Sequence, residues 1–202
     1  MLRALLLASL LALPACGQEA EETPPMTGND ETQPAGAQAA APGADIPSGE
    51  GRNIDAQIIG DTGEAIGTVE LLEGPNGVIM TLGLEDESLS PGWHGLHIHA
   101  VGDCSDTGEF KRSGGHLGKI EGGHGLLNPQ GPEKGDLPNI HVDEGGRADA
   151  QIFSNLFILA DLRDEDGAAL IMHESMDDHI SQPIGGAGAR VACAVLSGPN
   201  AR

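Results

Sequence analysis

Short runs that are rich in β-branched residues, or in which apolar and polar residues alternate, recur from about residue 51 to the end of the chain. Alternation with a period of two is typical of strands that bury one face, and no comparable run keeps the 3.6-residue period of a helix. Pro75-Asn76-Gly77 separates two such runs and predicts a hairpin turn. The pattern predicts an all-β fold, an antiparallel sandwich or barrel. The expected strands cover residues 53–59, 66–72, 78–84, 93–99, 147–153, 168–173 and 190–196.

A glycine-rich stretch at residues 102–140 interrupts this pattern and has little strand character. A loop of this length within a compact domain usually has a function or is held in place by a specific contact. We therefore expect it to carry part of a site.

The composition excludes two classes of protein. The 202 residues include 31 Asp and Glu against 10 Lys and Arg, a formal net charge of −21. Nucleic-acid phosphates are bound by clustered cationic side chains, and the few here are scattered, so we expect no nucleic-acid partner. No stretch reaches the roughly 18 to 20 unbroken apolar residues of a membrane-spanning helix. With 31 Gly, 13 Pro and 2% aromatic residues, the chain favours turns over long helices and suits one domain with appendages.

The N-terminus has the features of an export signal. Arg3 precedes the apolar run 4–13, and residues 13–16 (LPAC) resemble the bacterial lipobox, in which cleavage occurs before a cysteine that then carries the lipid. We expect a signal peptide at residues 1–15 and a membrane anchor at lipidated Cys16, with ordinary secretion and cleavage near Ala15 as the alternative. Gly17, in place of Asp, favours the outer membrane by resemblance to the sorting rule. The expected location is therefore the periplasm.

Residues 16–50 are rich in Ala, Pro, Gly, Gln, Glu and Thr and contain no Lys or Arg. Such a segment cannot bury enough apolar surface to offset its ordering entropy. We expect it to form a disordered acidic tether that leads from the anchor to a folded domain at residues 51–202.

Two cysteines remain once Cys16 is assigned to the lipid. Cys104 and Cys193 are an even pair in an exported chain, where oxidation is permitted. A disulfide between them would tie the long loop to the last strand. The alternative is a thiol metal site, which two isolated cysteines without a C-x-x-C spacing support poorly.

Histidines mark the candidate chemistry. His97 and His99 stand two apart on an expected strand, so both side chains leave the same face and can converge on one metal ion. Such a pair also occurs on ordinary polar surface. The further candidate ligands are His116 after two glycines, His124 eight residues later, Asp136, and His173 near the end of a late strand. Together these residues predict a metal centre.

Six segments of the chain resemble the bacterial copper/zinc superoxide dismutases. They are HGLHIH (94–99), SGGH (113–116), HGLLNPQGP (124–132), GDLPNI (135–140), HESMDD (173–178) and GAGARVAC (186–193). The resemblance extends over residues 51–198, in the family's order and with compatible spacings. It implies an eight-stranded Greek-key β-sandwich, closed into a flattened barrel with long metal-binding loops, which agrees with the strand pattern. It also implies dismutation of superoxide to dioxygen and hydrogen peroxide through Cu(II)/Cu(I) cycling.

The resemblance also implies roles for individual residues. The implied copper ligands are His97, His99, His116 and His173, and the implied zinc ligands are His116, His124 and Asp136. His116 would bridge the two metals and carry a proton in the reaction. Asp177 matches a carboxylate that orients one copper histidine and one zinc histidine. Arg190 matches the cation that guides and docks the superoxide anion.

One position departs from the family pattern. Glu133 stands where the family supplies its last zinc histidine, nine residues after His124 and three before Asp136. A glutamate oxygen is an accepted zinc ligand, so a site with two histidines and two carboxylates is chemically feasible. The alternative is a surface acid in a loop that has lost a ligand, with Lys134 as a competing partner and zinc weakened or absent.

Two other functions would use some of the same residues. A copper buffer or copper-delivery domain needs the copper ligands but neither Arg190 nor a bridging His116. A structural module without catalysis would be expected to lose copper ligands, and all four are present. We therefore expect an enzyme. We also expect His94 to hydrogen-bond to backbone rather than bind metal, and the sequence indicates no particular oligomeric state.

Overall fold

The computed structural model describes residues 51–198. The expected signal peptide at 1–15, Cys16 and the expected tether at 16–50 lie outside these residues. No helix in the described part of the chain is long and apolar enough to cross a membrane. Its strands are β1 (Asn53–Gly60), β2 (Ala65–Gly74), β3 (Gly77–Glu85), β4 (Gly92–His94), β5 (Leu96–His99), β6 (Ile140–Val142), β7 (Arg147–Ser154), β8 (Ala168–His173) and β9 (Arg190–Ser197). Two short 3₁₀ turns, η1 (Lys111–Ser113) and η2 (Leu159–Leu162), complete the elements.

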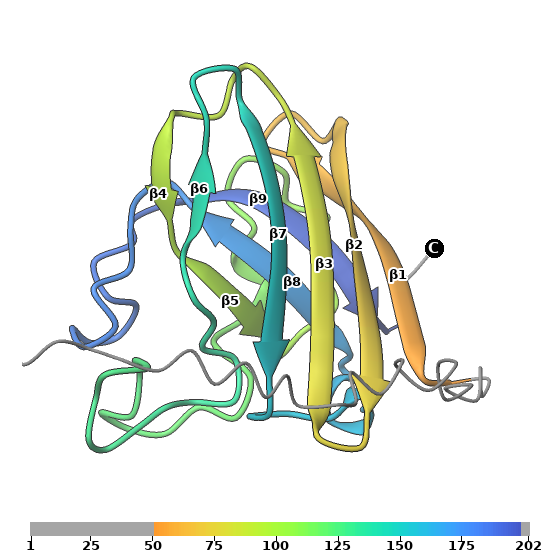
Figure 1. Cartoon of the computed structure of the whole chain (residues 1–202), viewed down its shortest axis with the longest axis vertical. Helices are drawn as coiled ribbons and strands as arrows, with labels where there is room; N and C mark the ends of the chain where they lie inside the picture. Colours follow the sequence, from red (N-terminus) through yellow and green to blue (C-terminus); the bar gives the residue numbers. More distant parts are fainter. Residues whose placement is uncertain (1–50, 199–202) are drawn as a thin grey trace, which may run out of the picture. The chain divides into compact units, whose positions relative to one another are not determined.

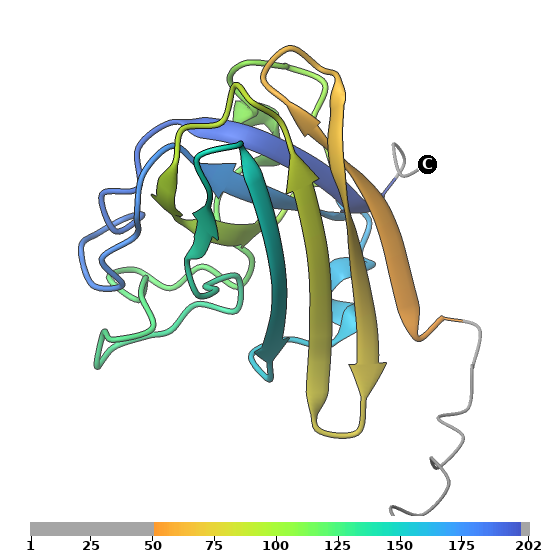
Figure 2. The same cartoon turned by 45° about the horizontal axis from the view of Figure 1, so that its top comes forward.

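Seven of the strands form one antiparallel sheet in the order β5-β8-β9-β1-β2-β3-β7, and β4 pairs with β6. Figures 1 and 2 show this sheet curled, with β1, β2, β3 and β7 on one side and β8 and β9 crossing behind them. β3 pairs with β7 although three strands lie between them in the sequence, as in Greek-key connections. The predicted all-β sandwich or flattened barrel is confirmed.

The core lies inside this curled sheet because the strands bury alternate residues. β3 buries Val78, Met80, Leu82 and Leu84 and turns the residues between them outward. β1 follows the same pattern with a burial period of two. This burial explains the alternation of apolar and polar residues along the chain.

The hairpin between β2 and β3 has the predicted two-residue turn. Gly74 and Gly77 pair across it, and Pro75-Asn76 form the turn. Gly77 has φ +146°, and a Cβ there would lie 2.4 Å from the carbonyl oxygen of Ser154 on β7. A side chain at this position would therefore collide with the neighbouring strand.

The strand expected at residues 93–99 is broken at Gly95. The Gly95 N–H donates to the Ser175 carbonyl, and its own carbonyl accepts from the His173 N–H. A Cβ on Gly95 would lie 2.9 Å from the Cβ of Ala187. The chain thus changes partner from β6 to β8 at this residue. Counted as one interrupted strand, β4 and β5 give the expected total of eight.

β8 is buried on both faces, which places the long loop over the sheet. Its inner face contributes Leu170 and Met172 to the main core. On its outer face, Ala169 and Ile171 pack with Phe110 and the two cysteines in a second, smaller cluster. A disulfide joins Cys104 to Cys193, with Cα atoms 5.9 Å apart and a sequence separation of 89. The loop is therefore cross-linked to the last strand, and the alternative thiol metal site is wrong.

Candidate metal centre

Three histidines, His97, His99 and His173, point from the outer face of the sheet toward a common site. His97 and His99 alternate along β5 with the core residues Leu96 and Ile98, so both rings point away from the main core. β8 lies beside β5 and ends at His173, whose N–H donates to Gly95. The ligand atoms of these three histidines lie within 4.8 Å of one another. We refer to His97, His99 and His173, together with His116, as the histidine cluster.

The long loop supplies the fourth histidine. His116 forms an isolated antiparallel bridge with His99, which brings the loop against β5. The centroid of its ring lies 4.2 Å from that of His97. The loop therefore closes over the strand pair and completes the histidine cluster.

Hydrogen bonds fix the orientation of the three rings that come from the strands. His97 Nε2 donates to Asp177 Oδ2 at 2.7 Å. His99 Nδ1 donates to the Gly114 carbonyl at 2.9 Å, and His173 Nδ1 donates to the Gly188 carbonyl at 3.1 Å. Since carbonyl and carboxylate oxygens only accept, these nitrogens carry the protons. The opposite nitrogen of each neutral ring is left with a free lone pair.

Those opposite nitrogens are buried and have no hydrogen-bond partner. Within residues 51–198, five buried side-chain nitrogens lack a partner: His97 Nδ1, His99 Nε2, His116 Nε2, His173 Nε2 and His179 Nδ1. Four of the five belong to the histidine cluster. Buried polar atoms without a partner are rare, and four convergent imidazole lone pairs fit a copper ion.

Burial also favours the neutral form of the three strand histidines of this cluster. Desolvation lowers the pKa of His97 to about 4 and that of His173 to about 3. It also lowers the pKa of His99 well below its usual value, with Arg190 as the next contribution. Neutral imidazole is the form that binds metal, so these nitrogens are available near neutral pH.

A second cluster lies on the other side of the His116 ring. The ligand atoms of His116, His124, Glu133 and Asp136 lie within 4.8 Å of one another, and all four residues are buried. His116 Nδ1 lies 2.9 Å from Glu133 Oε2 and 3.3 Å from Asp136 Oδ1. His124 Nδ1 lies 2.8 Å from Asp136 Oδ1. His116 therefore faces both clusters, with Nε2 toward one and Nδ1 toward the other.

In this second cluster, one oxygen of each carboxylate accepts hydrogen bonds from backbone N–H groups. Glu133 Oε1 accepts from Ile120 N–H at 2.9 Å. Asp136 Oδ2 accepts from Gly125 N–H at 2.7 Å and from Glu133 N–H at 2.9 Å. Each carboxylate is left with a single oxygen beside the histidines. Two such oxygens and two Nδ1 atoms make a four-donor set, which fits the tetrahedral preference of zinc.

The structure corrects the surface interpretation of Glu133. The residue is only 2% exposed, so it is not a surface acid. Lys134 does not compete for it, because its Nζ pairs with Asp161 Oδ1 at 2.7 Å.

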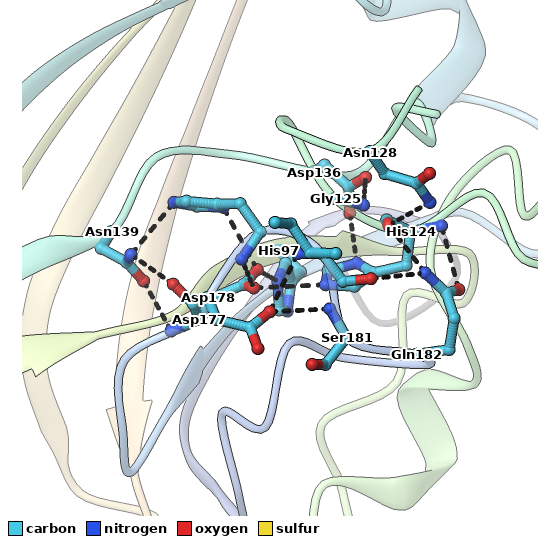
Figure 3. Close-up of polar contacts among 12 residues, drawn as sticks. His97, His124, Gly125, Asn128, Asp136, Asn139, Asp177, Asp178, Ser181 and Gln182 are labelled. Carbon is cyan, nitrogen blue, oxygen red and sulfur yellow. Dashed lines mark hydrogen bonds and ion pairs between the residues drawn. The ribbon is translucent and has the colours of Figure 1, made fainter. Parts of the chain in front are cut away.

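Asp177 joins the two clusters. Its Oδ2 accepts from His97 Nε2, and its Oδ1 lies 3.2 Å from His124 Nε2 (Figure 3). Asn139 holds the backbone of Asp177 from both sides. Its Nδ2 donates to the Asp177 carbonyl at 2.8 Å, and its Oδ1 accepts the Asp177 N–H at 2.9 Å. A shift of this loop segment would therefore move one histidine of each cluster.

In the second cluster, carboxylates raise the pKa of His124, whereas burial lowers the pKa values of the strand histidines. Burial lowers the pKa of His124, but the hydrogen bonds that His124 donates to Asp136 and Asp177 outweigh it and raise the value to about 9. Burial likewise opposes ionisation of both aspartates, and their histidine partners nevertheless hold the pKa of each well below its usual value. A metal ion that binds His124 must displace a proton.

Arg190 supplies a positive charge beside the histidine cluster. It opens β9 opposite His173. Its Nη1 donates to the Phe110 carbonyl at 2.6 Å and to Ser113 Oγ at 3.0 Å, and its Nη2 donates to the Gly114 carbonyl at 2.9 Å. These three partners are uncharged, so they orient the guanidinium without neutralising it.

The remaining histidines lie outside both clusters. His94 has both ring nitrogens at backbone carbonyls, those of His173 at 2.6 Å and Ser90 at 2.8 Å. His141 is exposed and stacks edge-on against Trp93. His179 Nε2 accepts from Asn139 Nδ2 at 3.0 Å.

Sequence reasoning did not identify Asn139 or Ser113 as part of the site. Both lie inside segments that carry the family resemblance, GDLPNI and SGGH, and this is the only signal that could have marked them. The carbonyls of Gly114 and Gly188 give no signal, because main-chain acceptors have no residue type.

Comparisons with known proteins agree on one family. The family model described as copper/zinc superoxide dismutase (SODC) matches residues 65–196. A copper–zinc superoxide dismutase from Caulobacter vibrioides is 45% identical over 141 residues, which cover 66% of this chain and 79% of the relative. A copper–zinc superoxide dismutase from Aquifex aeolicus is 40% identical over 147 residues, with coverages of 70% and 85%.

Solved structures are similar to the described domain. A double mutant of a superoxide-dismutase-like protein from Bacillus subtilis has a TM-score of 0.64 and 35% identity, covering 71% of this chain and 97% of that one. The copper/zinc superoxide dismutase from Brucella abortus has a TM-score of 0.59 and 28% identity, covering 71% and 99%.

Proposed function

The chain belongs to the copper/zinc superoxide dismutase family and converts superoxide to dioxygen and hydrogen peroxide, and from this premise we propose which of its residues do the work. Two superoxide anions and two protons give one dioxygen and one hydrogen peroxide. The protein must therefore attract an anion, hold a redox metal and deliver protons.

The histidine cluster is our proposed copper site. His97 would bind through Nδ1, and His99, His116 and His173 through Nε2, because these are the four nitrogens of the cluster that are buried without a partner within residues 51–198. Copper supplies the electron transfer by alternating between Cu(II) and Cu(I). The rings of His97, His99 and His173 contribute by staying neutral and by being oriented in advance by Asp177, Gly114 and Gly188.

His116 is the proposed proton carrier. Its ring faces both clusters, and its Nε2 has no other protein partner. A proton held at Nε2 after the first superoxide is oxidised lies next to the place where the second is reduced. Glu133 and Asp136, which face Nδ1, keep the ring in one orientation throughout.

Arg190 is the proposed docking group for superoxide. It is the cation beside the histidine cluster, in a chain whose formal net charge of −21 repels anions. A single oriented positive charge at the site raises the local concentration of an anionic substrate.

The second cluster is our proposed zinc site, with Glu133 as the fourth ligand in place of histidine. The support is geometric: Glu133 is buried, its Oε2 lies 2.9 Å from His116 Nδ1, and its other oxygen is held by Ile120 N–H. The carboxylate adds negative charge and a harder donor, so we propose a zinc site that is retained but weaker than one with three histidines.

Export and lipid anchoring at Cys16 complete the proposal. The Cys104–Cys193 disulfide suits an oxidising compartment such as the periplasm. The lipobox-like residues 13–16 support an acyl anchor, in the outer membrane by the identity of Gly17.

The observation that carries the proposed copper site is the set of four convergent unpartnered nitrogens. His173→Ala should remove one of them and abolish both copper retention and superoxide consumption. His141→Ala, at an exposed histidine outside the site, should leave both unchanged. Metal analysis and a superoxide-consumption assay on the purified mature protein test this. A fully copper-loaded protein with no activity above that of buffer would contradict the proposed site.

A further inference from the structure

Ser113 is a fully buried serine whose hydroxyl contacts three parts of the site. It ends the η1 turn and is 0% exposed. Its Oγ donates to the Phe110 carbonyl at 2.8 Å and accepts from Arg190 Nη1 at 3.0 Å. The same oxygen lies 3.3 Å from His99 Nδ1.

Chemistry leaves only one arrangement of hydrogens around this hydroxyl. The Phe110 carbonyl can only accept, so the hydroxyl proton points to it. Arg190 can only donate, and His99 Nδ1 carries the proton that it shares with the Gly114 carbonyl. A hydroxyl has one proton to donate and two lone pairs to accept with, and here all three are used. Such a group has no alternative orientation available.

Arg190 and His99 are linked twice through the same short segment. Both donate to the Gly114 carbonyl at 2.9 Å, and both approach Ser113 Oγ. Of the three groups to which Arg190 donates within the described part of the chain, Ser113 is the one that acts through its side chain. Ser113 is therefore the contact that a substitution can remove without moving the backbone.

The acceptor beneath Ser113 is itself firmly held. Phe110 has a positive φ of 49°, which is unfavourable for a residue with a side chain and persists only where its surroundings impose it. Its fully buried ring packs in the small cluster that contains the Cys104–Cys193 disulfide. The hydroxyl of Ser113 is thus fixed against the cross-linked part of the loop.

We propose that Ser113 is a positioning residue for superoxide docking, whose hydroxyl holds the Arg190 guanidinium beside His99. The proposal rests on the proposed role of Arg190. A cation that is fixed before the anion arrives loses no orientational freedom on docking, and this is how a preorganised site gains affinity. Without the hydroxyl, Arg190 keeps its charge and two carbonyl partners but can rotate.

The test uses the mature, metal-loaded protein and azide as an inert anion that binds at Cu(II). Ser113→Ala should weaken azide binding and lower kcat/KM for superoxide, each by about three- to tenfold, the range for losing one typical intramolecular hydrogen bond. Copper content should not change. The matched control is Ser154→Ala, at a buried serine on β7 whose hydroxyl accepts a hydrogen bond from the Leu156 N–H. It should leave azide affinity unchanged.

A double-mutant cycle separates the two proposals. Arg190→Ala should weaken azide binding strongly, and Ser113→Ala added to it should have little further effect. If Arg190→Ala weakens azide binding but Ser113→Ala does not, the inference about Ser113 is wrong and the role of Arg190 stands. The inference is also wrong if Ser113→Ala weakens azide binding equally in the natural protein and in the Arg190→Ala variant. Unchanged azide affinity in Arg190→Ala overturns the docking role itself.

Discussion

At the scale of single residues, hydrogen bonds determine which ring nitrogen of each strand histidine faces the site. His97 presents Nδ1 because Asp177 takes its Nε2 proton, whereas His99 and His173 present Nε2 because carbonyls take their Nδ1 protons. The identity of the three strand histidines alone would leave six ring nitrogens as possible metal donors. The protein therefore specifies a donor set before any metal arrives.

Glu133 offers the sharpest test at this scale. We expect Glu133→His to retain zinc more tightly than the natural protein, because imidazole is a softer donor that zinc prefers over competing hard ions. Dismutase activity should be less sensitive to zinc removal than the thermal stability of the protein is. Competition with a zinc chelator, run on both proteins, measures the difference. Glu121→His, at an exposed position of the same loop, is the matched control.

Glu133→His also removes the carboxylate oxygen that accepts the Ile120 N–H. The melting temperature of each variant is therefore measured together with its zinc retention. Zinc retention by the natural protein that equals or exceeds that of Glu133→His would mean that the carboxylate is a fully competent ligand. The weakened-site interpretation would then be wrong.

The sequence could supply the side-chain types of the site but not their supports. Histidine spacing and the family resemblance are enough to identify His97, His99 and His116 as candidate ligands. Ser113 and Asn139 act through contacts with groups 77 and 38 residues away in sequence, and such pairings have no local pattern. The carbonyls that orient His99 and His173 have no residue signature at all.

At the scale of elements, alternation predicted β1, β2, β3 and β7 because each has one face in the core and one in solvent. It did not predict β6, which has only three residues, too few for a period to emerge. It also missed the break between β4 and β5. That break depends on Gly95 meeting Ser175 and Ala187, which are remote in sequence.

The long loop depends on its cross-link. Reduction of Cys104–Cys193, or replacement of both cysteines by serine, should destabilise the protein by about 4 kcal/mol, the chain-entropy value for a closed loop of this length. Denaturant unfolding with and without reductant measures the loss. Alkylation of the unreduced, unfolded mature protein should label neither cysteine. Two labelled thiols would contradict a native disulfide.

At the scale of the whole molecule, the proposed lipid anchor at Cys16 would determine where the activity is located. Cys16→Ser should give a protein without an acyl group, released from the membrane fraction, because one modified residue would provide the entire anchor. Mass spectrometry of the N-terminus and membrane fractionation measure this. Cys104→Ser is the matched control and should stay lipidated. Cleavage at another residue, with no acyl mass, would rule out the anchor.

The opposing pKa shifts of the histidines should make the metal-free protein most stable near pH 6.5, the ordinary histidine pKa. Burial lowers the pKa of His97 to about 4, that of His173 to about 3 and that of His99 as well, so the unfolded chain binds more protons below 6.5. Stability must fall as the pH drops from 6.5 toward 3.

Above pH 6.5, one residue, His124, makes stability fall as the pH rises. Burial opposes protonation of His124, but Asp136 and Asp177 outweigh it and raise the pKa to about 9, so its contribution is complete below 6.5 and is lost as the pH rises through 9. Three histidines act on the acid side, where the lowered pKa values of Asp136 and Asp177 add to the loss, and one histidine acts on the alkaline side, so the acid limb should be steeper. Denaturant unfolding of the chelator-treated protein between pH 4 and 9 measures both limbs. His124→Gln should flatten the alkaline limb, because His124 is the histidine whose pKa is raised. It should also change the acid limb, because it removes a hydrogen-bond partner that holds the pKa values of Asp136 and Asp177 down. A metal-free protein whose stability rises steadily from pH 6.5 to 9 would contradict the ion pairs of His124.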